Sequence, residues 1–180
     1  TPPWAARAFC EWLNPPRGAT VWEPAINRGY LAKGLADHFD TVLGSDVHDY
    51  GAGFPQHDFL FPGKPLYHPD WVITNPPFRL AQEFVERALE VVSVGVAVIV
   101  RSVWAEGVGR YDNLFKTRPP EWILQHVERV PMVKGRYDAE ASTATSYSWF
   151  VWMQGMPLER GTRFGWIPPA RKRLFSVGDL

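Results

Sequence analysis

The run Asn75-Pro76-Pro77-Phe78 combines residue types that can activate an amine. An exocyclic amine on a base or an amide is a poor nucleophile, because its lone pair is delocalised into the π-system. Two oxygen acceptors aimed at its N–H groups favour the pyramidal geometry that frees the lone pair. The side-chain oxygen of Asn75 and the carbonyl of Pro76, which Pro77 restricts to extended geometry, are our candidates. With Phe78 as a stacking ring, the run predicts a catalytic site with preorganised acceptors.

Segments that suit a nucleotide-like cofactor come earlier, each after an expected strand. Residues 23–30 include Asn27 and Gly29, types that tolerate left-handed backbone geometry, so this loop can pass close to a ligand. Asp46 suits hydrogen bonding to ribose hydroxyls, and Asp58-Phe59 sets a carboxylate acceptor beside an aromatic face. The loop lacks the full glycine-rich fingerprint. Each carboxylate also has a simpler interpretation, as a strand cap, a turn residue or a solvated loop group, for Glu23, Asp46 and Asp58 respectively.

Strands and helices alternate along most of the chain, and this pattern positions the candidate residues at strand ends. The expected strands are at 19–22, 41 to about 46, 71–74, 94–100, 122–130 and 146–153. Helices are expected from the Thr1-Pro2 cap to Leu13, then at 29–39, 78–92 and 111–116. Two late strands without a helix between them predict an antiparallel pair. We therefore predict an α/β, doubly wound, mostly parallel Rossmann-like sheet with an antiparallel strand near its C-terminal edge.

Length and composition predict one domain. The chain has 180 residues, 46% of them hydrophobic, which excludes disorder, and neither a linker nor a repeat divides it. The longest apolar run, 91–100, is broken by Ser93 and Gly95 and is too short to span a membrane. Cys10 is the single cysteine, which excludes a disulfide framework or cysteine-based zinc site. We expect a cytoplasmic protein without a metal, since the chain opens with no secretory signal and its histidines lack metal spacing.

Charge is unevenly distributed although 19 basic and 19 acidic residues cancel. The net charge is −4 over residues 1–100, +3 over 101–136 and +1 over 137–180. This asymmetry suits an acidic cofactor half and a basic face for a polyanion, whereas the simpler interpretation is a solvated surface with chance clustering. The candidates for phosphate contacts are Arg101, Arg110, Arg118, Lys134 and Arg136.

In their order along the chain, these motifs resemble those of S-adenosylmethionine-dependent amino-methyltransferases: Glu23-Pro24-Ala25, Gly29, Asp46, Asp58-Phe59 and Asn75-Pro76-Pro77-Phe78. Thr1-Pro2 is similar to the family's extra motif before the first strand, where a helix N-terminus holds the methionine carboxylate. The motif order resembles that of gamma-type adenine-specific DNA methyltransferases. Residues 101–107 and 145–152 look like segments of small phage-type members, so the resemblance extends from residue 1 to about 167.

The resemblance implies a role for each motif. Glu23 would lie near the methionine amino group, Asp46 would bind the ribose, and Asp58 the adenine amino group. The segment Trp149-Phe150 would help to position a base extruded from the DNA stack. One departure is Asn27, which stands where the family usually has a glycine and should weaken cofactor binding. The implied cofactor-binding residues are Thr1, Pro2, Glu23, Pro24, Ala25, Asn27, Gly29, Asp46, Val47, Asp58, Phe59 and Asn75.

The predicted function is methyl transfer from S-adenosylmethionine to the N6 amine of adenine in DNA, carried out by one catalytic domain, 1–180, without a separate target-recognition domain. The substrate-binding candidates are Phe78, Trp149, Phe150, Arg101, Arg110, Lys134 and Arg136. Alternatives are the same chemistry on RNA or on a protein glutamine, and a binding module that has lost turnover. Cytosine N4 is less favoured, because that specificity usually goes with serine in place of Asn75. Weak, salt-sensitive DNA binding is expected.

Overall fold

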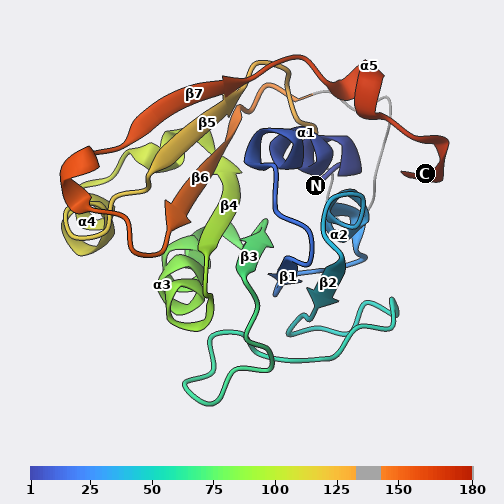
Figure 1. Cartoon of the computed structure of the whole chain (residues 1–180), viewed down its shortest axis with the longest axis horizontal. Helices are drawn as coiled ribbons and strands as arrows, with labels where there is room; N and C mark the ends of the chain where they lie inside the picture. The colour runs from blue at the N-terminus through green and yellow to red at the C-terminus, as the bar shows by residue number, and fades with distance from the viewer. Residues whose placement is uncertain (133–142, 180) are drawn as a thin grey trace.

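A computed structural model describes residues 1–132 and 143–179 and contains a seven-stranded sheet with helices on both faces (Figure 1). The strand order is β2-β1-β3-β4-β6-β5-β7. Pairing is parallel throughout, except that β6 runs antiparallel to both of its neighbours. The strands are β1 Thr20–Glu23, β2 Thr41–Gly44, β3 Trp71–Thr74, β4 Gly95–Arg101, β5 Trp122–His126, β6 Tyr147–Met153 and β7 Arg163–Ile167. This arrangement confirms the predicted fold class and the antiparallel late pair.

The helices are mostly short. The α-helices are α1 Pro3–Leu13, α2 Tyr30–Leu35, α3 Ala81–Val91, α4 Val108–Arg110 and α5 Arg171–Leu174. Single turns of tighter or wider helix are η1 Phe78–Leu80, η2 Ser102–Ala105, η3 Tyr111–Phe115, η4 Leu158–Arg160 and η5 Val177–Asp179. No helix within the described residues is both long enough and apolar enough to cross a membrane.

Two apolar clusters, one on each face, hold the sheet between helices. On one face α1 packs through Phe9, which stacks on Trp149 of β6 with ring centroids 4.2 Å apart. On the other face lie α3 and η3, together with Trp104, whose ring meets Phe150 edge to face at 5.0 Å. Residues of β4 alternate between the two clusters and are buried on both faces, as its continuous β-branched run predicts. Figure 1 shows α1 and α3 on opposite sides of the strands.

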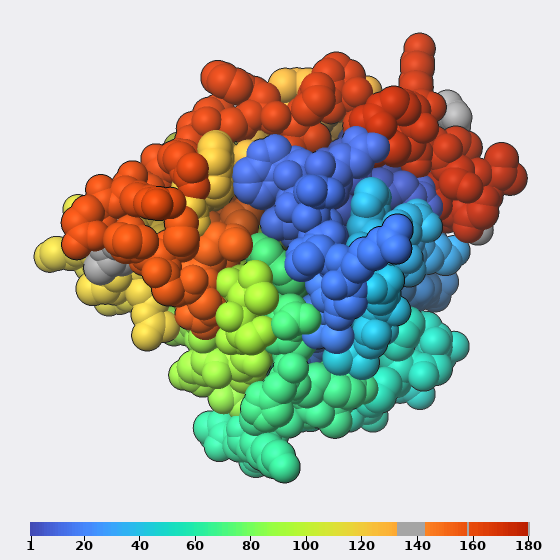
Figure 2. Space-filling view, in the orientation of Figure 1, coloured from blue at the N-terminus to red at the C-terminus, as the bar shows by residue number. Residues whose placement is uncertain are grey.

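Several element boundaries differ from the prediction. Pro2 caps α1 and Pro3 is its first residue, so Thr1 lies outside the helix. The second helix ends at Leu35 rather than at residue 39, and β7 forms in a region for which no element was predicted. Residues 47–69 contain no helix or strand, as expected; in Figure 2 they lie, teal to green, along the lower surface.

The C-terminal segment is tied to the first helix. The Arg7 guanidinium donates hydrogen bonds of 2.7 and 2.8 Å to the Asp179 carboxylate and one of 2.5 Å to Asp37. In Figure 2 the red C-terminal segment lies beside the blue N-terminal segment. Asp179 is 1% exposed, and both of its carboxylate oxygens accept from Arg7. The Arg7–Asp179 pair is therefore a buried ion pair rather than a solvated surface bridge.

Candidate active site

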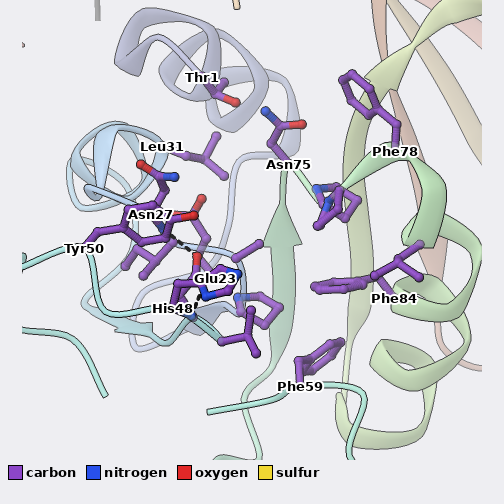
Figure 3. Close-up of a pocket in the computed structure, with 18 of the residues that line it drawn as sticks. Thr1, Glu23, Asn27, Leu31, His48, Tyr50, Phe59, Asn75, Phe78 and Phe84 are labelled. Carbon is purple, nitrogen blue, oxygen red and sulfur yellow. Dashed lines mark hydrogen bonds between the residues drawn. The ribbon is translucent and has the colours of Figure 1, made fainter. Parts of the chain in front are cut away.

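A cavity of about 970 Å³ opens at the carboxyl ends of β1, β2, β3 and β4 (Figure 3). Parallel strands bring their carboxyl ends to one edge of the sheet, so segments far apart in sequence meet there. Most of the predicted site residues line it: Thr1, Glu23, Pro24, Ala25, Asn27, Asp46, Val47, Asp58, Phe59, Asn75, Pro76, Pro77, Phe78 and Arg101. The lining does not include Pro2, which is buried, or Gly29, which caps α2.

Glu23, the last residue of β1, places a carboxyl group deep in this cavity. Glu23 is only 2% exposed, and its Oε2 atom has no hydrogen-bond partner among the described residues. Burial raises the pKa of Glu23 well above its usual range; the positive charge of the Thr1 amino group and a backbone hydrogen bond from Ala32 oppose the rise, and the charge of nearby Asp46 adds to it. An unpartnered buried carboxyl oxygen is costly, and a cationic or N–H donor group of a ligand would satisfy it.

Asp46, just beyond β2, holds the loop after β1. Its Oδ2 accepts a 2.9 Å hydrogen bond from the backbone N–H of Asn27, and its Oδ1 accepts one of 3.1 Å from His48. Asn27 has φ = 53° and Gly29 φ = 80°, so both adopt the left-handed geometry that their residue types predict. A Cβ at Gly29 would approach the Phe54 ring to 3.2 Å. The loop therefore turns tightly, with Asn27 and Asp46 facing the cavity.

The Asp58-Phe59 pair forms another wall. Asp58 is exposed and accepts a 3.0 Å hydrogen bond from the Leu60 backbone. Phe59 is 3% exposed, with its ring edge to face with Trp22 at 4.9 Å and 5.1 Å from Phe84. Phe59 is therefore fixed in the core while its ring also lines the cavity, and Asp58 keeps a carboxylate at the rim.

The Asn75-Pro76-Pro77-Phe78 run leaves the end of β3 and turns into η1. The Asn75 amide nitrogen lies 3.8 Å from the Met132 sulfur, whereas its side-chain oxygen is buried without a partner among the described residues. Figure 3 shows this side chain between Thr1 and Phe78, facing the cavity. An unsatisfied, positioned acceptor is what an incoming amine N–H requires.

Phe78 belongs to a small group at the mouth of the cavity. Its ring is 37% exposed and lies 6.2 Å from that of Tyr147, and the Arg101 guanidinium lies 5.2 Å from its centroid. Tyr147 starts the antiparallel strand β6 and is in register with Arg101, the last residue of β4. Tyr147 was not predicted as a site residue, because its place at this edge depends on β6 running opposite to the other strands.

Some predicted substrate-binding residues lie elsewhere. Trp149 and Phe150 are each 0% exposed and pack in opposite core clusters, so the prediction that they position a base is wrong and Tyr147 of the same strand lines the cavity instead. The Arg110 guanidinium donates hydrogen bonds to the backbone carbonyls of Trp104 and Glu106. Arg110 therefore stabilises its own segment and does not line the cavity. Lys134 and Arg136 lie outside the described residues.

Other lining residues were not singled out from sequence: Arg28, Tyr30, Leu31, His48, Tyr50, Leu60, Leu80, Phe84 and Met132. Most of them neighbour a predicted residue, and that proximity was the available signal.

Cys10 is buried, as expected of a small apolar side chain. Within the described part of the chain, no three histidine, cysteine or acidic residues are grouped to hold a metal.

Comparison with solved structures relates the fold to methyltransferases. A type I restriction-modification methyltransferase subunit from Streptococcus thermophilus superposes with a TM-score of 0.64 at 11% identity, covering 87% of this chain and 45% of that one. A putative RNA methyltransferase from Pyrococcus horikoshii gives 0.58 at 16% identity, covering 86% and 84%. The 23S rRNA methyltransferase ErmE gives 0.56 at 18% identity, covering 86% and 69%.

The chain thus spans less than half of the type I subunits that it resembles. No family model matches the sequence, and no curated protein matches it. The likeness is therefore one of three-dimensional structure, carried by the mixed sheet and its flanking helices. The chain has the Rossmann-like fold of methyltransferases.

Proposed function

We propose that this protein transfers a methyl group from S-adenosylmethionine to the exocyclic N6 amine of adenine in DNA. The observation that carries the proposal is the buried, unpartnered side-chain oxygen of Asn75, which lies in one cavity with Glu23 and Asp46. The motif order supports a gamma-like, phage-type enzyme.

The residues of the cavity fit the proposed cofactor. Its volume of about 970 Å³ lies at the upper end of the range for small-molecule sites. The unpartnered Oε2 atom of Glu23 suits the cationic methionine end, and Asp46 suits the ribose hydroxyls. Asp58 at the rim would accept from an adenine amino group in addition to the Leu60 backbone N–H, with the Phe59 ring beside it. S-adenosylmethionine would supply an electrophilic methyl group on a sulfonium.

The chain's own residues would orient the nucleophile. The Asn75 oxygen and the Pro76 carbonyl would accept hydrogen bonds from the two N–H groups of the target amine, which directs the nitrogen lone pair at the methyl carbon. The bound cofactor would supply the methyl group, with its S–C bond broken as the N–C bond is made, and the methylated amine would release one proton to solvent. Positive charge on the nitrogen would be stabilised by the same two oxygens, so no separate high-pKa base is needed.

Adenine in a nucleic acid suits the mouth of the cavity. The Phe78 ring, partly exposed and backed by Tyr147 and Arg101, offers a stacking surface for a planar base. The amine of a stacked, paired base is out of reach, so the target nucleotide must be extruded or unpaired. We choose DNA as the polymer because of the motif order. The structures with similar folds include both a type I restriction-modification methyltransferase subunit and a 23S rRNA methyltransferase.

Nucleoside mass spectrometry tests this function. The protein would be incubated with methyl-labelled S-adenosylmethionine and with separate pools of DNA, RNA and protein, and the products digested and identified. N6-methyladenine in DNA is the expected product. Label confined to RNA or to protein glutamine would reassign the substrate. Tight cofactor binding in calorimetry without product in any pool would reduce the protein to a binding module.

A further inference from the structure

Two aromatic rings stand exposed on the edge strand β7, outside the cavity. Trp166 is 65% exposed and Phe164 54%, and their rings meet edge to face with centroids 5.1 Å apart. The other tryptophans are core residues or, like Trp12, no more than 36% exposed. Solvated aromatic pairs of this kind are typical of binding surfaces.

The strand register identifies the face that carries these rings. Phe164 is paired with Ile123 and Trp166 with Gln125, and paired residues project from the same face of a sheet. Ile123 packs against the apolar cluster beneath α3, so both rings lie on the α3 face. In Figure 1, β7 lies at the outer edge of the sheet, beyond the strands that α3 covers.

A row of polar groups leads from this ring pair to the cavity. Gln125, the partner of Trp166, accepts hydrogen bonds of 2.8 Å from Ser102 and from Ser148. Ser102 directly follows Arg101, whose guanidinium lies against Phe78 at the cavity mouth. The row crosses three strand spacings, roughly 14 Å. That is the reach of about four stacked nucleotides at ~3.4 Å each.

The charges along this route suit a polyanion. Among the described residues, neither Arg101 nor Arg129 has a carboxylate within ion-pair distance, and Arg129 donates to Ser146 at the start of β6. Two carboxylates of β5 and the loops beside it are engaged: Glu121 by Arg163, and Glu128 by backbone N–H groups at the start of α5. Arg101 and Arg129 therefore offer two cations on this route, and these favour phosphate over an acidic peptide, while exposed Glu106 and Asp112 lie farther along the segment after β4.

We propose that Phe164 and Trp166 form a stacking platform for unpaired DNA bases that flank the target nucleotide. This inference rests on the proposed function, because the platform is defined by its distance from the cavity. Exposed rings on an open sheet face stack on single-stranded bases, whose faces are accessible, and not on paired ones. The ring pair would hold the strand while Arg101 and Arg129 contact phosphates.

Fluorescence anisotropy with a fluorescein-labelled DNA of about 12 unpaired nucleotides tests the platform. The double variant Phe164→Leu/Trp166→Leu keeps apolar side chains but removes both π-faces, and should bind roughly tenfold more weakly. Trp166→Phe retains a ring and should change the affinity by less than about threefold. Phe61→Leu, at a ring 64% exposed in the 47–69 segment, is the matched control and should bind like the wild type. Thermal melting verifies that each variant is folded.

The salt dependence separates stacking from charge. The ratio of wild-type to double-variant affinity should stay nearly constant as salt rises, because stacking releases no counterions, whereas both affinities fall together. Loss of Arg129, in Arg129→Gln, should reduce the salt slope instead. A double-variant defect that disappears at high salt would overturn the stacking assignment.

Two further assays distinguish failure of the platform from failure of the proposed function. If the wild type methylates DNA and the double variant matches it in both rate and DNA affinity, the platform is overturned and the function stands. If the wild type binds the oligonucleotide through these rings and yet methylates no DNA, the function fails and the binding surface stands.

Tighter binding to RNA of the same sequence overturns the DNA assignment. Dissociation of a dimer by the double variant, with unchanged DNA affinity, would assign the rings to a second copy.

Discussion

The Asp46 carboxylate accepts a 2.9 Å hydrogen bond from the backbone N–H of Asn27, so the end of β2 fixes the loop that follows β1. Asn27 sits in the left-handed region at φ = 53°, and its side-chain oxygen accepts from the Arg28 backbone. The turn of this loop therefore depends on the left-handed geometry of Asn27 and on the carboxylate of Asp46, which follows the neighbouring strand β2. Asp46 has two tasks, since the same carboxylate faces the cavity where a ribose would lie.

Two substitutions of Asn27 separate the effect of its backbone geometry on stability from the effect of its side chain on cofactor binding. Asn27→Ala places a residue without a polar side chain at positive φ and should lower the free energy of unfolding by about 1 kcal/mol, whereas Asn27→Gly should leave it nearly unchanged. Asn27→Gly also removes side-chain atoms from the cavity wall and should bind S-adenosylmethionine at least as tightly as the wild type. Denaturant unfolding and calorimetric titration measure the two effects.

Asn14 offers a matched control, because it has φ = 48° at the end of α1, outside the cavity. Asn14→Gly and Asn14→Ala should repeat the difference in stability without any change in cofactor affinity. A loss of cofactor affinity in Asn27→Gly would show that the Asn27 side chain contributes a contact and does not merely occupy space.

Glu23 should couple cofactor binding to pH. Burial raises the pKa of this carboxyl in the free protein, and a cationic ligand beside it favours the ionised form. Binding then releases a proton, so affinity should fall as the pH drops below the raised pKa of free Glu23 and should level off above it. Calorimetric titration with S-adenosylmethionine at several pH values gives the slope.

Glu23→Gln should abolish this slope and weaken binding. The same variant should be more stable than the wild type without ligand at high pH, because it no longer buries an unpaired negative charge. Exposed Glu83→Gln is the control and should alter neither the slope nor the melting temperature. A wild-type slope that persists in Glu23→Gln would assign the proton to another group.

Much of the fold could be predicted from local sequence, because β-branched runs punctuated by proline and glycine limit where strands begin and end. Trp71–Thr74 is an example: the strand begins with three apolar residues, and the proline pair follows one residue after it. The edge strand Arg163–Ile167 was not predictable in this way. Its Phe164 and Trp166 point to solvent, so the strand lacks the buried face that gives a recognisable pattern.

Residues of the cavity were predictable where they lie at the end of a parallel strand, because the carboxyl ends of parallel strands meet at one edge of the sheet. Glu23, Asp46 and Asn75 were singled out partly because each ends or follows an expected strand, and all three line the cavity. The misassignment of Trp149 and Phe150 has a different origin. Every residue of β6 except the last is buried, so local sequence does not tell which one reaches the cavity; the register with Arg101 decides that it is Tyr147.

Asn75→Ala should separate chemistry from binding. The change removes one of the two acceptors for the amine and should lower kcat by about 10²–10³-fold, the usual effect of deleting one preorganised polar group in an active site. Cofactor affinity should fall far less than kcat. Single-turnover methylation and calorimetry measure the two quantities, with exposed Asn113→Ala as the control. Unchanged turnover in Asn75→Ala would refute the assigned mechanism.

Buried His126 should make the protein acid-sensitive. Its Nε2 accepts a 3.0 Å hydrogen bond from the Trp149 indole, and burial lowers the pKa of His126 from 6.5 to about 4. The unfolded chain therefore takes up a proton between these pH values while the folded protein does not. Stability is complete above about pH 6.5 and should fall by up to ~3 kcal/mol as the pH drops to about 4.

His126→Gln tests this sign directly. The glutamine oxygen can still accept from the Trp149 indole, but the side chain does not titrate. The variant should be less sensitive to acid between about pH 6.5 and 4, even if it is less stable at neutral pH because the imidazole packs edge to face against Trp4. Denaturant unfolding at a series of pH values measures the difference, and exposed His68→Gln should follow the wild type. If His126→Gln and the wild type lose stability in parallel over that range, the acid sensitivity lies in the carboxylates and not in this histidine.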